Sequence, residues 1–588
     1  MKTILDIISE HLSEAFVSAG YDGKYGRASV SNRPDLCEFQ CNGALAAAKE
    51  YKKAPIMIAQ DVAGVLKDDD AFDEISAVAP GFLNLRLNGP FLTGYLDRMA
   101  ADEKFGLTVK DKPDTTVIDY GGPNVAKPLH VGHLRSAIIG EAVKRIMLYM
   151  GDEVTGDIHL GDWGLQMGLI MTELRHREPD LPYFDEDFEG EYPSEPPFTL
   201  SELEEIYPAA SARSKNDEEY KEEAMNDTFL LQQGDRGRSA LWKHIMNVSI
   251  PDLKKNYEKL NVSFDLWKGE SDAKPYIDGM VSMMKDTGLA YESQGALVVD
   301  VKEETDSKEM PPCMILKSDG AALYTTTDLA TIAERKKLID PARMVYVADK
   351  RQEMHFVQVF RCARKTGVIG EDVKLDFLGF GTMNGADGKP FKTRDGGVMR
   401  LEALLDDINE EMYKKIRDNH EVDEDEARAT ASVVALAAVK YGDLSNQATK
   451  DYIFDIDKFT SFEGNTGPYI LYTIVRIKSI LNKFTGDGGS LEGLEFNTSP
   501  VDTEKALMLE LIRFNQVIAS AYEELAPHKI CAYIYDVANA FNRFYHENRI
   551  LNEENAARKA GFLKLLDLTK RLLETGIDIL GFSAPEKM

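Results

Sequence analysis

Two histidines stand three residues apart in the segment 123–133, PNVAKPLHVGH. His130 and His133 flank Gly132 where a loop gives way to a helical pattern, and residues at this spacing share one helix face. Gly132 lets the backbone approach a ligand closely, and a helix N-terminus offers free N–H groups to an anion. The group could hold phosphates and stabilise charge during attack on an α-phosphate. A pair of capping or core histidines is the alternative.

The elements around this segment indicate a nucleotide-binding unit. A β-favouring run with Val117 and Ile118 stops at Gly121-Gly122-Pro123. A helix is predicted next, and later strand–helix pairs imply a parallel sheet with helices on its faces. The predicted helix has apolar Leu134, Ile138, Ala142, Ile146 and Tyr149 at spacings of three to four, and the later pairs are 344–347 with 352–366 and 375–379 with 401–418.

Three domains are expected, and together they define an α/β fold class. Residues 1–112 mix helical patterns with strand-like runs at 56–58 and 81–87, which predicts an α+β N-terminal domain. Residues 113–430 form the Rossmann-type parallel-sheet domain, with a polar helical insertion near 175–260. Residues 431–588 show no strand signal and predict an all-α bundle. Its amphipathic stretches are 470–481, 507–522, 530–544 and 562–572.

Composition excludes several classes of protein. Apolar runs fall far short of the roughly 18 residues of a membrane helix, and the N-terminal 20 residues read as an amphipathic helix, which predicts a cytoplasmic protein with no membrane partner. Cys37 and Cys41 are the only close pair among five cysteines, so no structural zinc is expected. The net charge of −30 argues against binding nucleic acid by bulk charge and leaves local basic patches open.

A resemblance to a known family follows from the sequence blocks. PNVAKPLHVGHLRSAIIGEAV resembles the signature region of class I arginyl-tRNA synthetases, with His130–His133 in the place of the HIGH motif. Further blocks resemble the family in its own order over nearly the whole chain. They are HLGDWGLQMG (159–168), KSDGAALYTTTDLA (317–330), YVADKRQEMH (346–355), DGKPFKTRDGGVMRLEALLD (387–406), NTGPYILYTIVRIKSI (465–480) and APHKICAYIYDVANAFNRFYHENRIL (526–551).

The resemblance implies how an arginine substrate is held. Its guanidinium is planar and always charged, and carboxylates hold it best. Asp119, Tyr324 and Asp328 would face this group. Asn124 and Gln352 would hold the α-amino and α-carboxylate end, and His159 would line the same pocket. The residues alone allow plainer roles, with Asp328 as a helix N-terminal acid and Asn124 as a turn residue.

The family's second ATP signature, KMSKS, is degraded in this sequence. In register stands FKTRDG (391–396), with Thr393 where the second lysine would be. That lysine neutralises the transferring phosphates, so its loss needs compensation. Lys127 lies just before the HVGH tetrad, and we expect it to take over with help from Lys392 and Arg394. The alternative is that Lys392 and Arg394 are only surface charges. The resemblance also places ATP against Pro128, Gly132, His130 and His133.

The function implied is that of an arginine–tRNA ligase, which joins L-arginine to tRNA(Arg) at the expense of ATP. Mg²⁺ should arrive with ATP, because no all-protein metal cage is visible. We expect a monomer whose helical bundle binds the anticodon through aromatic and basic residues at 472–478 and 541–549. The N-terminal domain, through residues 21–42, would reach the tRNA elbow. Three rivals are a small nucleotidyltransferase, a synthetase for another amino acid and a catalytically inactive relative.

Overall fold

The centre of the molecule is a four-stranded parallel sheet. The computed structural model describes residues 1–318, 320–385, 387–389, 399–419 and 423–588. The strands lie in the order β11-β10-β5-β6, and every neighbouring pair is parallel, as predicted. Their bounds are β5 Thr115–Asp119, β6 Glu153–Asp157, β10 Arg343–Asp349 and β11 Lys374–Phe380. Sequence reasoning did not find β6, because EVTGD has charged ends and a glycine and no apolar run.

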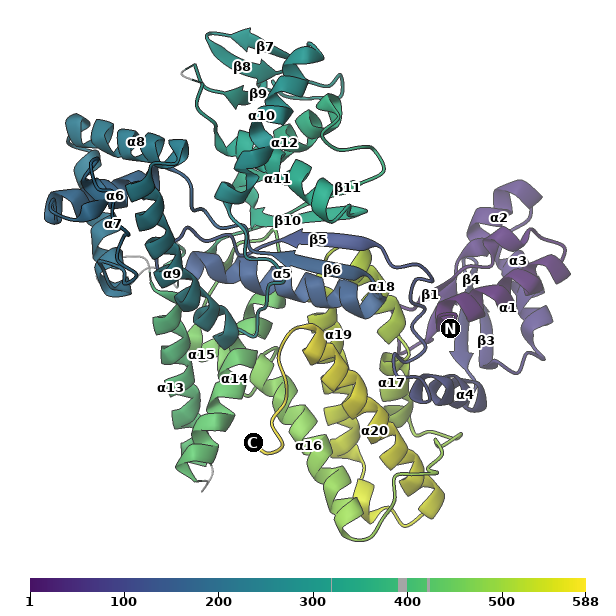
Figure 1. Cartoon of the computed structure of the whole chain (residues 1–588). Helices are drawn as coiled ribbons and strands as arrows, with labels where there is room; N and C mark the ends of the chain where they lie inside the picture. Colours follow the sequence, from purple (N-terminus) through teal and green to yellow (C-terminus); the bar gives the residue numbers. More distant parts are fainter. Residues whose placement is uncertain (319, 386, 390–398, 420–422) are drawn as a thin grey trace.

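Helices cover both faces of this sheet, and alternating side chains decide which core each strand residue joins. Figure 1 shows α5 along one face and α11 and α12 on the other. Ile118 and Val345 point into the core with α5, whereas Val117 and Met344 join the core with α11 and α12. The bounds are α5 Val131–Met150, α10 Glu270–Asp286, α11 Tyr324–Leu338 and α12 Glu353–Thr366.

The N-terminal part is α+β, as expected. Its antiparallel sheet has the order β1-β2-β4-β3. The strand-like reading of 56–58 is wrong: these residues lie in α3, which has Pro55 in its first turn and buries Ile58 and Val62 at helical spacing. The elements are α1 Ile4–Ser18, β1 Ala28–Val30, β2 Phe39–Cys41, α2 Gly43–Tyr51, α3 Pro55–Leu66, β3 Phe72–Val78, β4 Phe82–Leu87 and α4 Gly89–Ala100.

The polar segment near 175–260 is helical, as its pattern predicts. Figure 1 shows its helices gathered at one end of the sheet, beside the start of α5. They are α6 Leu165–Arg177, α7 Leu200–Ser214, α8 Glu218–Gln233 and α9 Arg236–Lys259. A small antiparallel sheet that the sequence analysis did not predict follows α10, with strands β7 Ala290–Ser293, β8 Ala296–Val299 and β9 Cys313–Leu316.

The C-terminal part is dominated by helices. The amphipathic stretch 507–522 is two helices rather than one, and α14 runs through the boundary expected between 430 and 431. The two-residue strand β13 pairs with β12, although no strand was expected beyond 430. The elements are β12 Met383–Asn384, α13 Leu401–Asn419, α14 Glu424–Leu444, β13 Tyr452–Ile453, α15 Ile456–Phe459, α16 Gly467–Gly486, α17 Asp502–Leu511, α18 Phe514–Glu523, α19 Pro527–Glu547 and α20 Ala556–Ile579.

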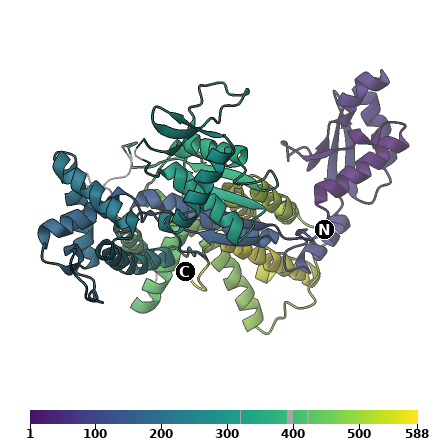
Figure 2. The same cartoon turned by 45° about the horizontal axis from the view of Figure 1, so that its top comes forward.

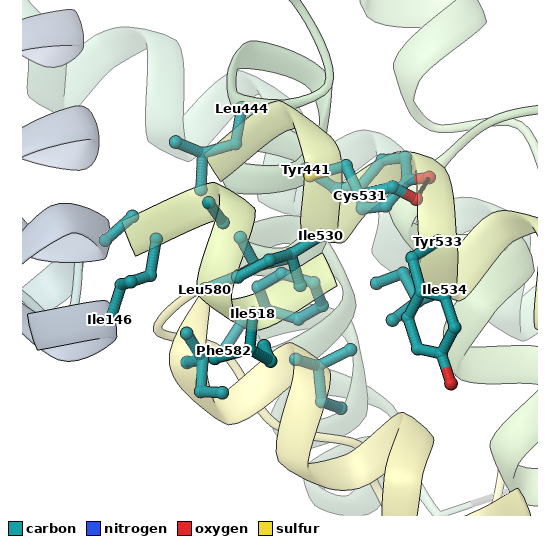
Figure 3. Packing of buried hydrophobic residues seen from close by; sticks show 14 of the residues in the cluster. Ile146, Tyr441, Leu444, Ile518, Ile530, Cys531, Tyr533, Ile534, Leu580 and Phe582 are labelled. Carbon is teal, nitrogen blue, oxygen red and sulfur yellow. Dashed lines mark hydrogen bonds between the residues drawn. The ribbon is translucent and has the colours of Figure 1, made fainter. Parts of the chain in front are cut away.

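One hydrophobic core joins the helical bundle to the sheet domain. Figure 3 shows Ile146 of α5 beside Leu444, Ile530 and Leu580 of the bundle, and all of these residues are buried. Arg135 of α5 adds an ion pair of 2.8 Å to Asp443 of α14, with both side chains buried. The position of α5, and therefore of the segment at its start, is fixed by the C-terminal helices as well as by the sheet.

The N-terminal part stands to one side of the molecule, as both views show (Figure 1, Figure 2). Lys505 of α17 joins it by an ion pair of 2.7 Å to Glu38 and a hydrogen bond of 2.7 Å to the Leu87 carbonyl. Within the described ranges, no helix combines the length and the apolar character that crossing a bilayer requires.

Candidate active site

The HVGH tetrad forms a reciprocal cap at the start of α5. His130 is the N-cap, and its Nδ1 accepts a hydrogen bond of 3.0 Å from the Gly132 N–H. The His130 N–H donates in turn to Nδ1 of His133, at 3.1 Å. Both rings therefore use Nδ1 as an acceptor, which leaves the proton of each neutral imidazole on Nε2. The structure thus shows the capping role, and this role occupies only the Nδ1 atom of each ring.

The two imidazoles are neutral at physiological pH. Their ring centroids are 3.9 Å apart. Burial, followed by the charges of His130 and Lys127, lowers the pKa of His133 to about 3. Burial and then Lys127 also lower the pKa of His130. The pair can donate hydrogen bonds to phosphate oxygens, and the positive charge that phosphates require must come from other groups.

The chain after the predicted KMSKS-like loop returns to this tetrad. The Val131 N–H donates to the Met399 carbonyl at 3.1 Å, and the Leu401 N–H donates to the Leu129 carbonyl at 2.8 Å. Lys392 and Arg394, both predicted to assist phosphate transfer, lie outside the described residues. Pro128 is half-buried two positions before His130, in the loop that this pairing holds.

Lys127 lies against the insertion rather than against an acid. Its Nζ stands 4.1 Å from the ring centroid of Tyr207 on α7. Its charge acts on both imidazoles of the tetrad, since it lowers the pKa of each. In the described part of the chain, no carboxylate oxygen lies within 4.0 Å of this amine. The predicted phosphate ligand is thus near the tetrad and keeps its charge unpaired by an acid.

Asp119 ends β5 beside Asp157, the last residue of β6. Both carboxylates pair with the same side chain of the protein, Arg335. Arg335 of α11 donates through Nη2 to Asp119 at 2.6 Å and to Asp157 at 2.7 Å. Its guanidinium is also 5.3 Å from the ring centroid of Tyr346. One oxygen of Asp119, a predicted substrate ligand, is therefore already paired within the chain.

Asp328 lies in the second turn of α11, and the N-cap of this helix is Leu323. Its Oδ2 is 2.5 Å from Nε2 of His355 on α12. Tyr324 begins the same helix one turn earlier and is exposed. Desolvation, then Glu270, then Tyr207 raise the pKa of Tyr324. The charges of Glu270 and Tyr207 both act on Tyr324, so this phenol lies in the same region as the acid and the insertion helix.

Glu270 is the carboxylate that sequence reasoning left outside its site. Burial raises its pKa to about 7, and the charges of Asp162 and Asp328 act in the same direction, whereas His159 opposes them. In the described residues no lysine, arginine or histidine nitrogen lies within 4.0 Å of this carboxylate. No motif in the surrounding stretch WKGES signals this burial, so the sequence analysis does not include Glu270 among its site residues.

His159 lies in the same region as these acids. Its backbone φ is +35°, in the left-handed region, and neither ring nitrogen, both buried, has a hydrogen-bond partner in the described residues. Its charge would act on Asp119, Asp162 and Glu270. An imidazole that is buried without partners among carboxylates is suited to contact a polar ligand.

The loop after β5, which carries Asn124, pairs with the loop after β6 in a short parallel bridge between Asn124 and Gly161. The Val125 N–H donates to the Gly161 carbonyl at 3.1 Å, and the Gly161 N–H donates to the Pro123 carbonyl at 3.1 Å. A Cβ on Gly161 would lie 2.1 Å from Oδ1 of Asn124, so only glycine fits there without a shift. Gln352 is exposed at the far end of β10, where α12 begins.

Comparison with known proteins shows to which family the chain is similar. A model of the catalytic domain of class I tRNA synthetases (R) matches residues 97–456. The chain is 64% identical to an arginine–tRNA ligase of Agathobacter rectalis over 597 aligned residues, with all of both chains covered. The chain belongs to the arginyl-tRNA synthetase family. Models of the arginyl-tRNA synthetase N-terminal domain and the DALR anticodon-binding domain match residues 2–87 and 470–588.

Further relatives agree with this membership of the synthetase family. An arginine–tRNA ligase of Alkaliphilus oremlandii is 55% identical over 588 residues, again with full coverage of both chains. The solved arginyl-tRNA synthetases of Plasmodium falciparum and Thermus thermophilus align over all of both chains with TM-scores of 0.81 and 0.77. Each is 23% identical to this chain, so these two structures establish the shared fold.

Proposed function

We propose that this chain is an arginine–tRNA ligase. It activates L-arginine with ATP to arginyl-adenylate and diphosphate, then passes the arginyl group to the 3′-terminal ribose of tRNA(Arg) and releases AMP. The full-length identity of 64% with an arginine–tRNA ligase carries this conclusion. That identity over all 588 residues also argues against a small nucleotidyltransferase, which would not match over this length.

In the first step the arginine carboxylate attacks the α-phosphate of ATP. The Nε2–H groups of His130 and His133 donate to phosphate oxygens, and the free N–H groups at the start of α5 add their dipole. Gly132 and Pro128 border the nucleotide. Lys127, together with Lys392 and Arg394, neutralises the charge that builds up on the leaving diphosphate.

Mg²⁺ accompanies ATP in this proposal. In the residues that the structure describes, no group of three or more His, Cys, Asp or Glu side chains could hold a metal ion. The ion supplies neutralisation of the phosphates when it is bound to them. The protein contributes positioning: neutral donors at the tetrad and a lysine held nearby.

The guanidinium of arginine binds between carboxylates of separate elements. Asp328 offers the oxygen that His355 leaves free, and Tyr324 offers its hydroxyl. Glu270 offers a carboxylate with no cationic nitrogen within 4.0 Å among the described residues. Asp119 contributes its second oxygen to the same region, because Arg335 pairs with the first. Charge-assisted bonds of this kind are strong and select a guanidinium over an ammonium.

The other end of arginine binds nearer the tetrad. Asn124 and Gln352 hold the α-amino and α-carboxylate groups, and His159 lines the pocket between the two ends. Positioning and charge stabilisation supply the rate, because no covalent enzyme nucleophile is implied.

The tRNA contacts three parts of the chain in this proposal. Residues 1–112 reach the tRNA elbow, 113–430 form the catalytic domain and 431–588 bind the anticodon. In the last part the Arg476 guanidinium lies 4.5 Å from the ring centroid of Tyr472 and 5.1 Å from that of Tyr545. Aromatic rings with arginine between them are suited to stack unpaired bases and hold their phosphates. The enzyme acts as a monomer in the cytoplasm.

Aminoacylation of purified tRNA with labelled arginine tests the function directly. Lysine and citrulline serve as controls, since citrulline keeps the shape of arginine and lacks its charge. Arginine alone should be attached to tRNA and should stimulate ATP–diphosphate exchange. Charging with lysine, or no charging with any of the three, would overturn the assignment.

A further inference from the structure

Helix α7 of the insertion contacts the two segments that flank the proposed ATP site. Tyr207 places its ring 4.1 Å from Nζ of Lys127, in the loop before the tetrad. One turn earlier on α7, Glu204 forms an ion pair of 2.8 Å with Arg400. Arg400 in turn pairs with His130 in an antiparallel bridge. Tyr207 and Glu204 lie on one face of α7. They therefore hold this helix against the loop that carries Lys127 and against the segment at Arg400.

The type of contact matters for the chemistry. A carboxylate partner would neutralise Lys127, and the partner would have to be displaced before the amine could bind phosphate. The face of an aromatic ring holds an ammonium by its quadrupole and leaves its full charge in place. Tyr207 thus restricts where the Lys127 side chain points without consuming the charge, which is the requirement for a preorganised phosphate ligand.

The anchor of Tyr207 is itself firm. Its ring packs against a small buried cluster formed by Leu169, Ala210, Tyr220 and Ala224, in which α6, α7 and α8 meet. Tyr207 also lies close enough to Tyr324 to influence that phenol. The insertion helix therefore contacts the lysine on the ATP side through this aromatic ring.

We propose that Tyr207 is a positioning residue for arginine activation, in which its ring holds the Lys127 ammonium beside the HVGH tetrad. The inference rests on the proposed function of Lys127 as the ligand of the transferring phosphates. It gives the insertion a role in the chemistry, since any displacement of α7 moves the ring on which Lys127 rests.

The test compares variants at residue 207 by ATP–diphosphate exchange with tRNA present. Tyr207→Leu, and Tyr207→Gln as a second variant without the ring, should lower kcat about 3- to 30-fold, the range of a cation–π contact. Tyr207→Phe keeps the ring and should stay within about twofold of the unchanged enzyme. The KM for arginine should hardly change. An equal loss in the Phe variant would assign the effect to the hydroxyl and overturn the proposal.

A double-mutant cycle separates positioning from general damage. If Tyr207 acts through Lys127, then Lys127→Ala combined with Tyr207→Leu should be no slower than Lys127→Ala alone. Losses that multiply would contradict the inference. Near-normal activity of Lys127→Ala would instead refute the proposed phosphate role, which separates the two failures. Tyr413→Leu is the matched control, because this half-buried tyrosine also holds a cation, Arg428 at 4.3 Å, and should leave kcat unchanged.

Discussion

Replacing Glu270 by glutamine tests the acidic pocket most sharply. The change keeps the shape of the side chain and removes its charge. Burial raises the pKa of this carboxyl from 4.5 to about 7, so holding it ionised without a partner costs roughly 3 kcal/mol. A bound guanidinium recovers much of that free energy, which the variant cannot do. Glu270→Gln should therefore raise the KM for arginine by about 30- to 150-fold, equivalent to 2–3 kcal/mol.

The same carboxyl sets a pH dependence. Below about pH 7 Glu270 is protonated in the free enzyme and offers no charge, whereas the arginine guanidinium stays charged throughout. The KM for arginine should thus rise as pH falls below 7, by up to about tenfold per pH unit. The variant should show no such dependence, because glutamine does not titrate.

Arginine titrations of ATP–diphosphate exchange between pH 6 and pH 8 measure both effects. Asp278→Asn is the matched control, since Asp278 is an exposed acid on the same helix and its loss changes the net charge equally. A KM for Glu270→Gln close to that of the control, or an unaltered pH dependence, would refute the placement of Glu270 at the guanidinium. The kcat at saturating arginine should change less than KM, because the contact exists before the transition state.

Three further outcomes follow from single contacts. His355→Asn removes the partner of Asp328 and should raise the KM for arginine roughly 3- to 10-fold, as expected for one lost hydrogen bond; an unchanged KM would contradict this. Gly161→Ala places a Cβ 2.1 Å from Oδ1 of Asn124 and should lower arginine activation at least about tenfold, so full activity would show that the loops adjust. Lys440 is buried, and its amine donates to two backbone carbonyls; burial lowers its pKa to about 7. Above pH 7 this lysine is therefore protonated in the unfolded chain and neutral in the folded chain, so the free energy of unfolding rises with pH. Denaturant titrations at pH 7 and pH 9 should show a gain of about 1.4 kcal/mol per pH unit for the unchanged enzyme over Lys440→Met, and parallel curves would refute it.

Local pattern alone determined the nucleotide-binding elements. The run around Val117, the stop at Gly121-Gly122-Pro123 and the helical spacing after His133 predict strand, loop and helix, and the structure has all three. These features depend on residues next to one another in the chain, so a period of two or 3.6 is enough to reveal them. The prediction of a strand at residues 56–58 was wrong, because Pro55 begins a helix there and this signal outweighed the short apolar run.

The tertiary structure alone decided what each charged side chain faces. Asp119 meets Arg335 from 216 positions away, and Glu270 reaches the region of Asp328 by the packing of α10 on α11. Burial and Coulomb interactions depend on distance in space and not along the chain, so no spacing in the sequence could assign them. Residue types and motifs indicated which side chains are able to bind a guanidinium and a phosphate. The fold determined which of these side chains are already paired within the chain and which keep their charge for a substrate.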